Sequence, residues 1–202
     1  MKKIILISVI LLIALTANAS TITPTDYVRK KTDAFTAVLD DPKYKKPSMK
    51  QIQRDDLWQV IRYSFNYRLI SQRALGRNWK KFSKKEKITF VGLFTQLIGK
   101  TYLKTIQKNY TGERFSYIKE KMLPKNKALV KTVMISKKYG NIPIDYVLRF
   151  KKNKWSVYDI KVENVSLVKN YRVQFKKLLR NKKPYDLIKQ LDEKVKENER
   201  KN

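Results

Sequence analysis

The chain has 202 residues and carries 47 Lys and Arg against 17 Asp and Glu, a formal net charge of +30 at pH 7. It contains no His and no Cys, which excludes a Ser-His-Asp triad, a Cys nucleophile, a disulfide, a zinc site of thiolates or imidazoles, and a lipid anchor on an N-terminal Cys. Because 42% of the residues are hydrophobic and 11% are aromatic, the composition predicts a folded core rather than a disordered basic tail. The charge indicates an anionic partner such as nucleic acid, lipid headgroups or an acidic protein surface.

The N-terminus has the pattern of a cleaved secretory signal peptide over residues 1–19. Two lysines precede an apolar run from Ile4 to Leu15, and Ala17-Asn18-Ala19 is an A-x-A cleavage signal. A membrane anchor is the alternative, but the run is shorter than the about 20 residues that span a bilayer. We therefore expect a soluble, exported domain over residues 20–202 that begins at Ser20. Export makes nucleic acid a poor partner and phospholipid headgroups a better one.

Helical spacing of apolar residues dominates the N-terminal half of this domain. The spacing predicts one helix over Thr25–Leu39 and a second over Ser48–Leu75, with Gly76 as its stop. A third helix ends near Tyr110, and an S-x-x-E capping box formed by Ser83 and Glu86 marks its start.

The period of the apolar residues then changes to two, which predicts strands. The expected strands cover residues 114–122, 128–136, 142–151 and 155–165. Gly140-Asn141 and Lys152-Asn153 occupy the positions of hairpin turns. Four antiparallel strands joined by short loops are the most economical topology.

The register of the last strand raises a specific question. A two-residue turn at Lys152-Asn153 places Phe150 and Trp155 on the same face. The apolar alternation of Tyr158, Ile160 and Val162 favours the opposite phase. A β-bulge in the last strand satisfies both patterns.

Helical spacing returns after the sheet, over Leu167–Leu179 and from Pro184 onward. The last stretch, about residues 184–202, reads as a charged tail. This order of elements predicts an α+β domain with helices packed on one face of a four-stranded antiparallel sheet.

Two groups of short strings occur in the order and spacing of one family. The first is Ala74-Leu75-Gly76-Arg77-Asn78-Trp79, followed by Phe90, Phe94, Leu97 and Thr101-Tyr102; the second is Tyr158-Asp159-Ile160, Val165-Ser166-Leu167-Val168, Asn170-Tyr171-Arg172 and Gln174-Phe175. Across about residues 60–180, the chain resembles the MlaC-type family, also described as toluene-tolerance proteins. These are soluble phospholipid-binding components of a Gram-negative intermembrane lipid transport system.

The chain departs from the family pattern at two positions. Asn66 stands where the family usually has Asp, which removes any role for a carboxylate there. Asn164 stands where the family often has Gly, and Asn is the next most tolerant residue for a left-handed backbone.

The resemblance implies a curved sheet and helices that enclose an apolar pocket for acyl chains. It implies a periplasmic carrier that shuttles phospholipid between the outer and inner membranes and performs no catalysis. Phospholipid is then the cargo, and no cofactor or metal is expected. The implied partners are an inner-membrane MCE-domain complex with an ABC transporter and an outer-membrane lipid-handling lipoprotein complex.

Apolar residues on the cleaner faces of the predicted elements are the candidates for the pocket lining. We expect the lining to comprise Leu97, Tyr102, Ile106, Met134, Tyr146, Leu148 and Ile160, with Tyr171 and Phe175 closing one side. Ile160 depends on the proposed bulge. The alternative is that these residues form an ordinary core.

Basic clusters are candidates for headgroup binding or for docking, through transient contact with a membrane surface. One includes Lys84 and Lys85 at a helix start, and the other includes Lys176 and Lys177. A basic residue near an anionic leaflet contributes about 1 kcal/mol. Arg172 has two interpretations: it contacts lipid phosphate, or it makes a structural ion pair or a helix-capping contact. We favour the structural interpretation for Arg172 and for Asp159.

Two further functions compete with lipid transport. An isomerase-like enzyme would pair Asp145 or Asp159 as a base with Tyr146 or Tyr158 as a donor in an apolar pocket. A scavenger of anionic polymer or lipopolysaccharide would rest on the charge alone.

Overall fold

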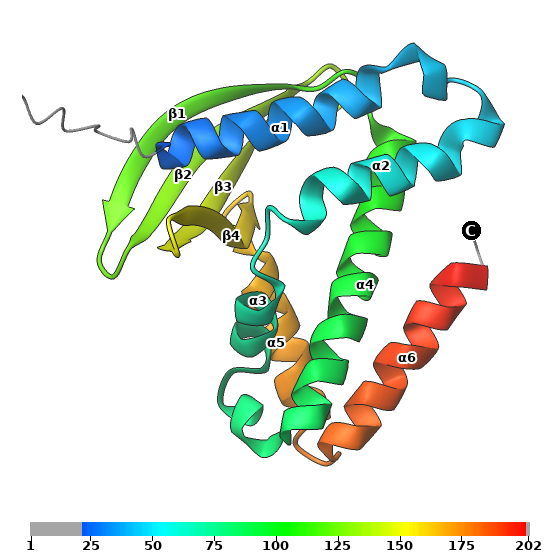
Figure 1. The fold of residues 1–202 in the computed structure, drawn as a ribbon, viewed down its shortest axis with the longest axis vertical. Coiled ribbons are helices and arrows are strands. Elements are labelled where there is room, and N and C mark those ends of the chain that lie inside the picture. Colours follow the sequence, from blue (N-terminus) through cyan, green and yellow to red (C-terminus); the bar gives the residue numbers. More distant parts are fainter. Residues whose placement is uncertain (1–21, 201–202) are drawn as a thin grey trace, which may run out of the picture.

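The structure of the protein is a computed structural model that describes residues 22–200. The predicted signal peptide and the Ser20 terminus lie outside the described residues. Figure 1 shows a sheet with α1 lying across it, and a group of helices, α3 to α6, that extends away from the sheet. No helix within residues 22–200 is long and apolar enough to cross a membrane.

The first helices partly follow the prediction. α1 (Pro24–Asp40) confirms the first predicted helix, but the second splits into α2 (Lys50–Arg62) and α3 (Tyr67–Leu75). The chain leaves the helix between them because Val157 of the sheet hydrogen-bonds the backbone of Ser64 and Asn66. Asn66 then caps α3 by accepting a hydrogen bond from the Leu69 backbone N–H.

The remaining helices follow their predicted bounds. α4 (Lys84–Asn109) begins with the predicted capping box, in which Ser83 and Glu86 exchange hydrogen bonds of 3.2 and 2.8 Å. α5 (Leu167–Leu178) and α6 (Pro184–Arg200) confirm the two C-terminal helices. Short 3-10 turns occupy Pro42–Tyr44, Pro47–Met49 and Gly76–Lys81.

The described sheet has five antiparallel strands in the order β1-β2-β3-β4-β5, which corrects the predicted four. The strands are β1 (Arg114–Leu123), β2 (Lys127–Ser136), β3 (Gly140–Lys151), β4 (Lys154–Val162) and β5 (Val165–Ser166). β5, which was not predicted, forms because Glu163 and Asn164 make a tight turn with φ of 50° and 66°, in agreement with the left-handed backbone expected at Asn164.

The hairpin turns were half correct. Lys152 and Asn153 form the predicted turn between β3 and β4, with φ of 51° and 56°. Gly140 and Asn141, however, are the first residues of β3, and the turn before them comprises residues 137–139. Gly140 supplies the positive φ of 74° at which the chain re-enters the ladder.

The predicted bulge in β4 is present. Phe150 pairs with Trp155, and Leu148 pairs with Val157, but Val147 pairs with Asp159, so Tyr158 is the extra residue. The bulge brings Ile160 opposite Tyr146 as predicted, but Tyr158, expected on the same face as Ile160, packs with Val147 on the other face.

Helices cover both faces of the sheet, which corrects the expectation of helices on one face. Neighbours in a strand point to opposite faces. Leu148 is buried in a cluster with Val28 of α1, whereas Val147 is buried in a cluster with Ile70 of α3 and Val168 of α5. We call these faces the α1 face and the opposite face.

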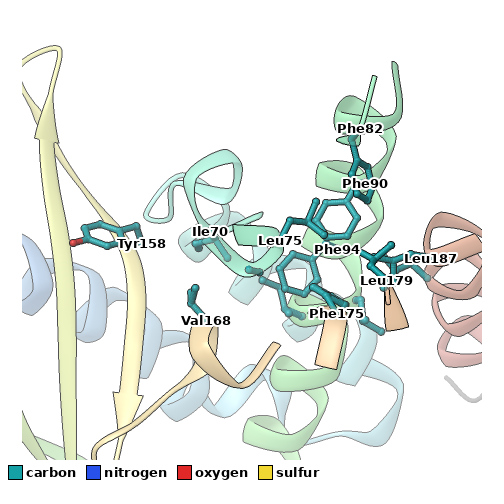
Figure 2. Close-up of a cluster of buried hydrophobic side chains, with 14 of the residues drawn as sticks. Ile70, Leu75, Phe82, Phe90, Phe94, Tyr158, Val168, Phe175, Leu179 and Leu187 are labelled. Atoms are coloured by element: carbon teal, nitrogen blue, oxygen red, sulfur yellow. The ribbon is translucent and has the colours of Figure 1, made fainter. Parts of the chain in front are cut away.

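The main core lies among the helices. Phe94 is 1% exposed, and its ring contacts those of Phe90, Tyr171 and Phe175 at centroid distances of 5.5, 4.8 and 5.2 Å. Figure 2 shows this aromatic group between α4 and α5, with Leu187 of α6 beside it. We call the buried side chains among α3, α4, α5 and α6 the helical core; they include Ile70, Phe90, Phe94, Leu97, Val168, Phe175 and Leu187.

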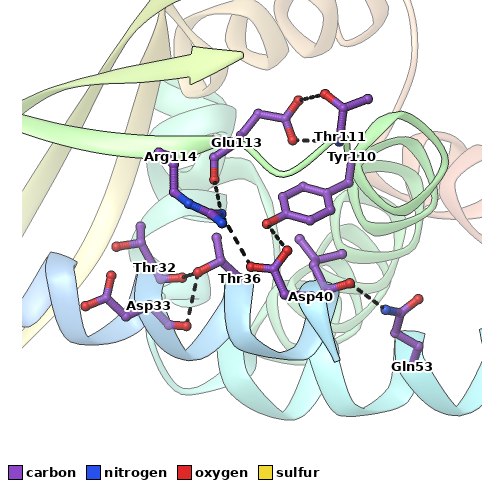
Figure 3. Close-up of polar contacts among 10 residues, drawn as sticks. Thr32, Asp33, Thr36, Asp40, Gln53, Tyr110, Thr111, Glu113 and Arg114 are labelled. Carbon is purple, nitrogen blue, oxygen red and sulfur yellow. Dashed lines mark hydrogen bonds and ion pairs between the residues drawn. The ribbon is translucent and has the colours of Figure 1, made fainter. Parts of the chain in front are cut away.

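Polar contacts fix the end of α1 to the start of β1 (Figure 3). Asp40 accepts a 2.9 Å hydrogen bond from the Tyr110 hydroxyl and lies 3.4 Å from the Arg114 guanidinium. Burial, together with Asp40, raises the pKa of Tyr110 to about 12. The buried Glu113 accepts hydrogen bonds from Thr111 and from Ser136 of β2. These contacts hold α1 across the sheet.

Candidate functional site

Part of the α1 face remains open. Six apolar side chains there form three cross-strand pairs: Met134 with Ile142, Ile144 with Val162, and Tyr146 with Ile160. All six keep some solvent-accessible surface, in contrast to the buried Leu148 and Val130 on the same face. We call these six residues the open apolar surface. Neighbouring pairs lie close enough to make one continuous patch.

Tyr146 shows what kind of surface this is. Burial raises the pKa of Tyr146 well above its ordinary value of 10.0, with the neighbouring Tyr117 adding to the effect. The Tyr146 hydroxyl has no hydrogen-bond partner within residues 22–200, yet it is not among the polar atoms sealed from solvent there. A largely buried, apolar and still accessible position suits contact with an apolar ligand.

Aromatic residues connect this face to the helices. Phe65 packs against both the helical core and the cluster under α1. The ring centroids of Tyr67 and Phe65 lie 5.8 Å apart, and those of Tyr67 and Trp58 lie 5.9 Å apart. Burial also raises the pKa of Tyr67, whose hydroxyl has no partner among the described residues.

The sequence-based lining set omitted several of these residues. Ile142 and Ile144 belong to the same predicted alternation as Tyr146 and Leu148, which makes them equal candidates. Phe65 and Tyr67 flank Asn66, the position at which the chain departs from the family pattern. Trp58 carried no sequence signal beyond helical spacing, because its position depends on how α2 packs against α4.

Five of the predicted lining residues lie on α4 and α5, and three of them, Tyr102, Ile106 and Tyr171, keep accessible surface. Tyr102 and Ile106 are one turn apart on α4 and are 41% and 38% exposed. Burial raises the pKa of Tyr102 and of Tyr171, and each hydroxyl influences the pKa of the other. Tyr171 also packs on Phe94, so this exposed apolar pair adjoins the helical core.

The other predicted lining residues divide into two groups. Met134, Tyr146 and Ile160 lie together on the open apolar surface. Leu97 and Phe175 are buried in the helical core, and Leu148 is fully buried under α1. Contact of Leu97, Leu148 and Phe175 with a ligand stays a prediction.

The two predicted basic clusters lie at one end of the molecule. The rings of Phe90, near the start of α4, and Phe175, near the end of α5, are 5.5 Å apart. Lysines 84 and 85 therefore lie at the same end as lysines 176 and 177, far from the sheet (Figure 1). All four are exposed, and none has an ion-pair partner within residues 22–200. We call this region the basic end.

Arg172 and the candidate enzymatic carboxylates have structural contacts. The Arg172 Nε donates a 2.7 Å hydrogen bond to the Arg73 carbonyl, near the end of α3. Asp159 accepts hydrogen bonds from the Ser166 hydroxyl and from the Val168 backbone at the start of α5. Asp145 lies 4.0 Å from Lys161. A headgroup role for Arg172 stays a prediction.

A separate cleft of about 570 Å³ lies between α2, α4 and α6. Its lining is mostly polar and charged, including Arg54, Asp55, Lys100 and Glu199. Lys100 and Glu199 are paired with each other there. This cleft does not include any residue of the open apolar surface.

The fold and this surface define an α+β domain whose sheet presents an accessible apolar face, a class of domain suited to binding an apolar ligand. The sequence profile of the MlaC protein family matches residues 29–193. The chain belongs to the MlaC family, which confirms the resemblance drawn from its motifs.

A solved structure has the same fold. It is the phospholipid-binding protein from Ralstonia solanacearum in complex with a phospholipid, with a TM-score of 0.73 and 19% sequence identity. The similarity covers 85% of this chain and 96% of that chain. A search of curated proteins found no significant match.

Proposed function

We propose that this protein is a periplasmic carrier that shuttles phospholipid between the outer and inner membranes. The open apolar surface is the observation that carries the proposal, because a continuous accessible apolar patch marks a binding site. Membership of the MlaC family supports it. The Ralstonia protein of the same fold, which holds a phospholipid, supports it further.

The energetics explain why a carrier needs such a surface. Each CH₂ group removed from water is worth about 0.8 kcal/mol, so two acyl chains with about 30 methylenes cost on the order of 20 kcal/mol to expose. In the proposed complex, Met134, Tyr146 and Ile160 cover one side of the chains. Contact of the acyl chains with Tyr102, Ile106 and Tyr171 on α4 and α5 is a further part of the proposal.

The basic end provides docking in this proposal. Its lysines attract an anionic leaflet or an acidic partner surface, and the attraction is screened beyond about 8–10 Å in ordinary salt. The docking partners are an inner-membrane MCE-domain complex with an ABC transporter and an outer-membrane lipoprotein complex. Raising the salt concentration should release the protein from anionic vesicles while the bound lipid stays in place.

The proposal treats the protein as a binding protein and not as an enzyme. The isomerase interpretation needs a free carboxylate in an apolar pocket. Both carboxylate oxygens of Asp159 already accept hydrogen bonds, and Asp145 is close to Lys161. Neither carboxylate lies on the α1 face with the open apolar surface. Asp145 and Asp159 are the neighbours of Tyr146 and Ile160 along their strands, so their side chains point to the opposite face.

Organic extraction of the purified protein with mass spectrometry tests the proposal. We expect a stoichiometric diacyl phospholipid; an empty protein that also fails to take lipid from vesicles would contradict it. Intact-mass analysis of the periplasmic fraction tests export and should find a chain that begins at Ser20. Recovery of a chain with Met1, or recovery only with membranes, would contradict export.

A further inference from the structure

Two arginines without acidic partners lie on the opposite face of the sheet. The Arg73 guanidinium sits 4.9 Å from the centroid of the Tyr158 ring. Arg149 follows the buried Val147 by two residues in β3, so its side chain is on the same face. Neither guanidinium has an ion pair or a hydrogen bond to any residue in the described part of the chain.

One hydrogen-bond donor of the Arg73 guanidinium, its Nε, has no partner. Its Nε is sealed from solvent and has no hydrogen-bond partner, one of two such side-chain atoms within residues 22–200. A buried donor that is left unpaired retains its full desolvation cost. The terminal nitrogens of Arg73 are not among the sealed atoms, so they are the donors open to an acceptor.

The bulge in β4 contributes a third group, the Tyr158 side chain, which lies beside Arg73. Tyr158 is the extra residue of the bulge, and bulges commonly re-aim a side chain near functional sites. Figure 2 shows the Tyr158 hydroxyl pointing away from Ile70 and Val168 of the helical core. That hydroxyl has no partner among the described residues, and it is not sealed from solvent.

The electrostatics agree with this geometry. Burial raises the pKa of Tyr158, and the charges of Arg73 and Arg149 act in the opposite direction, so both guanidinium groups are near the hydroxyl. Asp159 is the neighbouring acid, but its oxygens are held by Ser166 and Val168. Two guanidinium groups and one carboxylate act on the Tyr158 hydroxyl, so the net charge of these three groups is positive.

We propose that Arg73, Arg149 and the Tyr158 hydroxyl form a binding site for a phosphate group. Arginine forks bind phosphate oxygens in pairs, and a tyrosine hydroxyl donates to a further oxygen. The site lies on the sheet face opposite the open apolar surface, so it does not depend on acyl-chain binding. The phosphate belongs either to a free phosphate compound or to a lipid headgroup.

Calorimetric titration of the full-length mature protein with sodium phosphate, at an ionic strength held constant with sodium chloride, tests the site. We expect a saturable isotherm that weakens about tenfold or more in Arg73→Gln and in Arg149→Gln. The matched controls are Arg68→Gln, on the exposed side of α3, and Lys151→Gln, two residues beyond Arg149 in β3. Both remove one positive charge and should leave the affinity within about twofold, because exposed charges act weakly at this salt.

A second probe separates the two sources of phosphate. Dihexanoylphosphatidylglycerol below its micellar concentration displaces inorganic phosphate if the site takes a headgroup, and fails to displace it if the site takes a free phosphate. Saturable binding of inorganic phosphate that the two site variants weaken supports the site under either outcome. The site is wrong if phosphate shows no saturable binding, or if the control variants lose as much affinity as Arg149→Gln. Thermal melts of each variant establish that the fold is retained, and lipid extraction reports on acyl-chain binding separately.

Discussion

The helical core and the open apolar surface are built from the same kinds of residue but in different states of packing. In the helical core, Phe90, Phe94 and Phe175 fill the space between α4 and α5 with edge-to-face contacts. On the open apolar surface, Met134, Tyr146 and Ile160 pair across strands and keep accessible area. Apolar patterning in the sequence therefore marks both the filled helical core and the open apolar surface, and only the packing of the side chains distinguishes the two.

The largest expected effect is loss of cargo from the open apolar surface. Met134→Glu places a carboxylate where the proposal puts acyl chains, and an unpaired buried carboxylate costs several kcal/mol unless the lipid leaves. We expect the purified variant to carry little phospholipid and to melt cooperatively, because Met134 is only half-buried.

Ile135→Glu is the matched control for this variant. Ile135 is the next residue of β2, points to the opposite face and is 44% exposed. It should keep its phospholipid. Equal lipid content in the two variants would show that Met134 does not face the cargo.

The helical core should respond in the opposite way. Phe94→Ala removes a ring that three other rings contact, and such a change costs about 3–5 kcal/mol of unfolding free energy. Chemical denaturation measures this loss, and the fraction that remains folded should still retain lipid. Val173→Ala, at a position on α5 that is 69% exposed, should change stability by less than about 0.5 kcal/mol.

Much of the fold was predictable from the sequence, because local signals determine it. Three features have a local cause in the sequence. They are the capping box at Ser83 and Glu86, the change from helical to alternating apolar spacing after Gly112, and the opposed face patterns of Trp155 and Tyr158 that predict the bulge. The split of α2 from α3 was not predictable, since it depends on hydrogen bonds to Val157, almost a hundred residues later.

The candidate site was less predictable than the fold. The alternation that contains Tyr146 and Leu148 marks both residues as inward, but α1 covers Leu148 and leaves Tyr146 accessible. Which part of a sheet face a helix covers is decided by distant contacts such as Asp40 with Arg114. The proximity of the two lysine clusters likewise follows from how α4 packs on α5.

The contact between α2 and α4 should be intermediate in its effect. A Cβ atom built on Gly99 would lie 2.5 Å from the Trp58 ring, so Gly99→Ala should cost about 1–3 kcal/mol in a denaturant melt. Gly92 is exposed on the same helix with nothing within 4 Å of a built Cβ, and Gly92→Ala should stabilise the protein by up to about 1 kcal/mol. Equal effects of the two substitutions would show that α2 does not pack closely on Gly99.

The smallest expected effect is on the alkaline limb of stability. The pKa of Tyr146 is raised in the folded protein, so the unfolded chain loses this proton first as the pH rises through 10.0. Tyrosine ionisation therefore lowers the unfolding free energy above that pH and leaves it unchanged below. Tyr146→Phe should flatten the decline. An unchanged slope in Tyr146→Phe would mean that burial does not raise the pKa of Tyr146.

Photo-crosslinking with a phospholipid that carries a diazirine at the end of one acyl chain tests the central claim most directly. Mass spectrometry of the irradiated complex should place the adducts on the open apolar surface, at Met134, Tyr146 or Ile160, with further adducts at Tyr102 or Ile106. Adducts confined to Ile135 or Val173, or an even distribution over the exposed apolar residues, would contradict the claim that this surface holds the acyl chains.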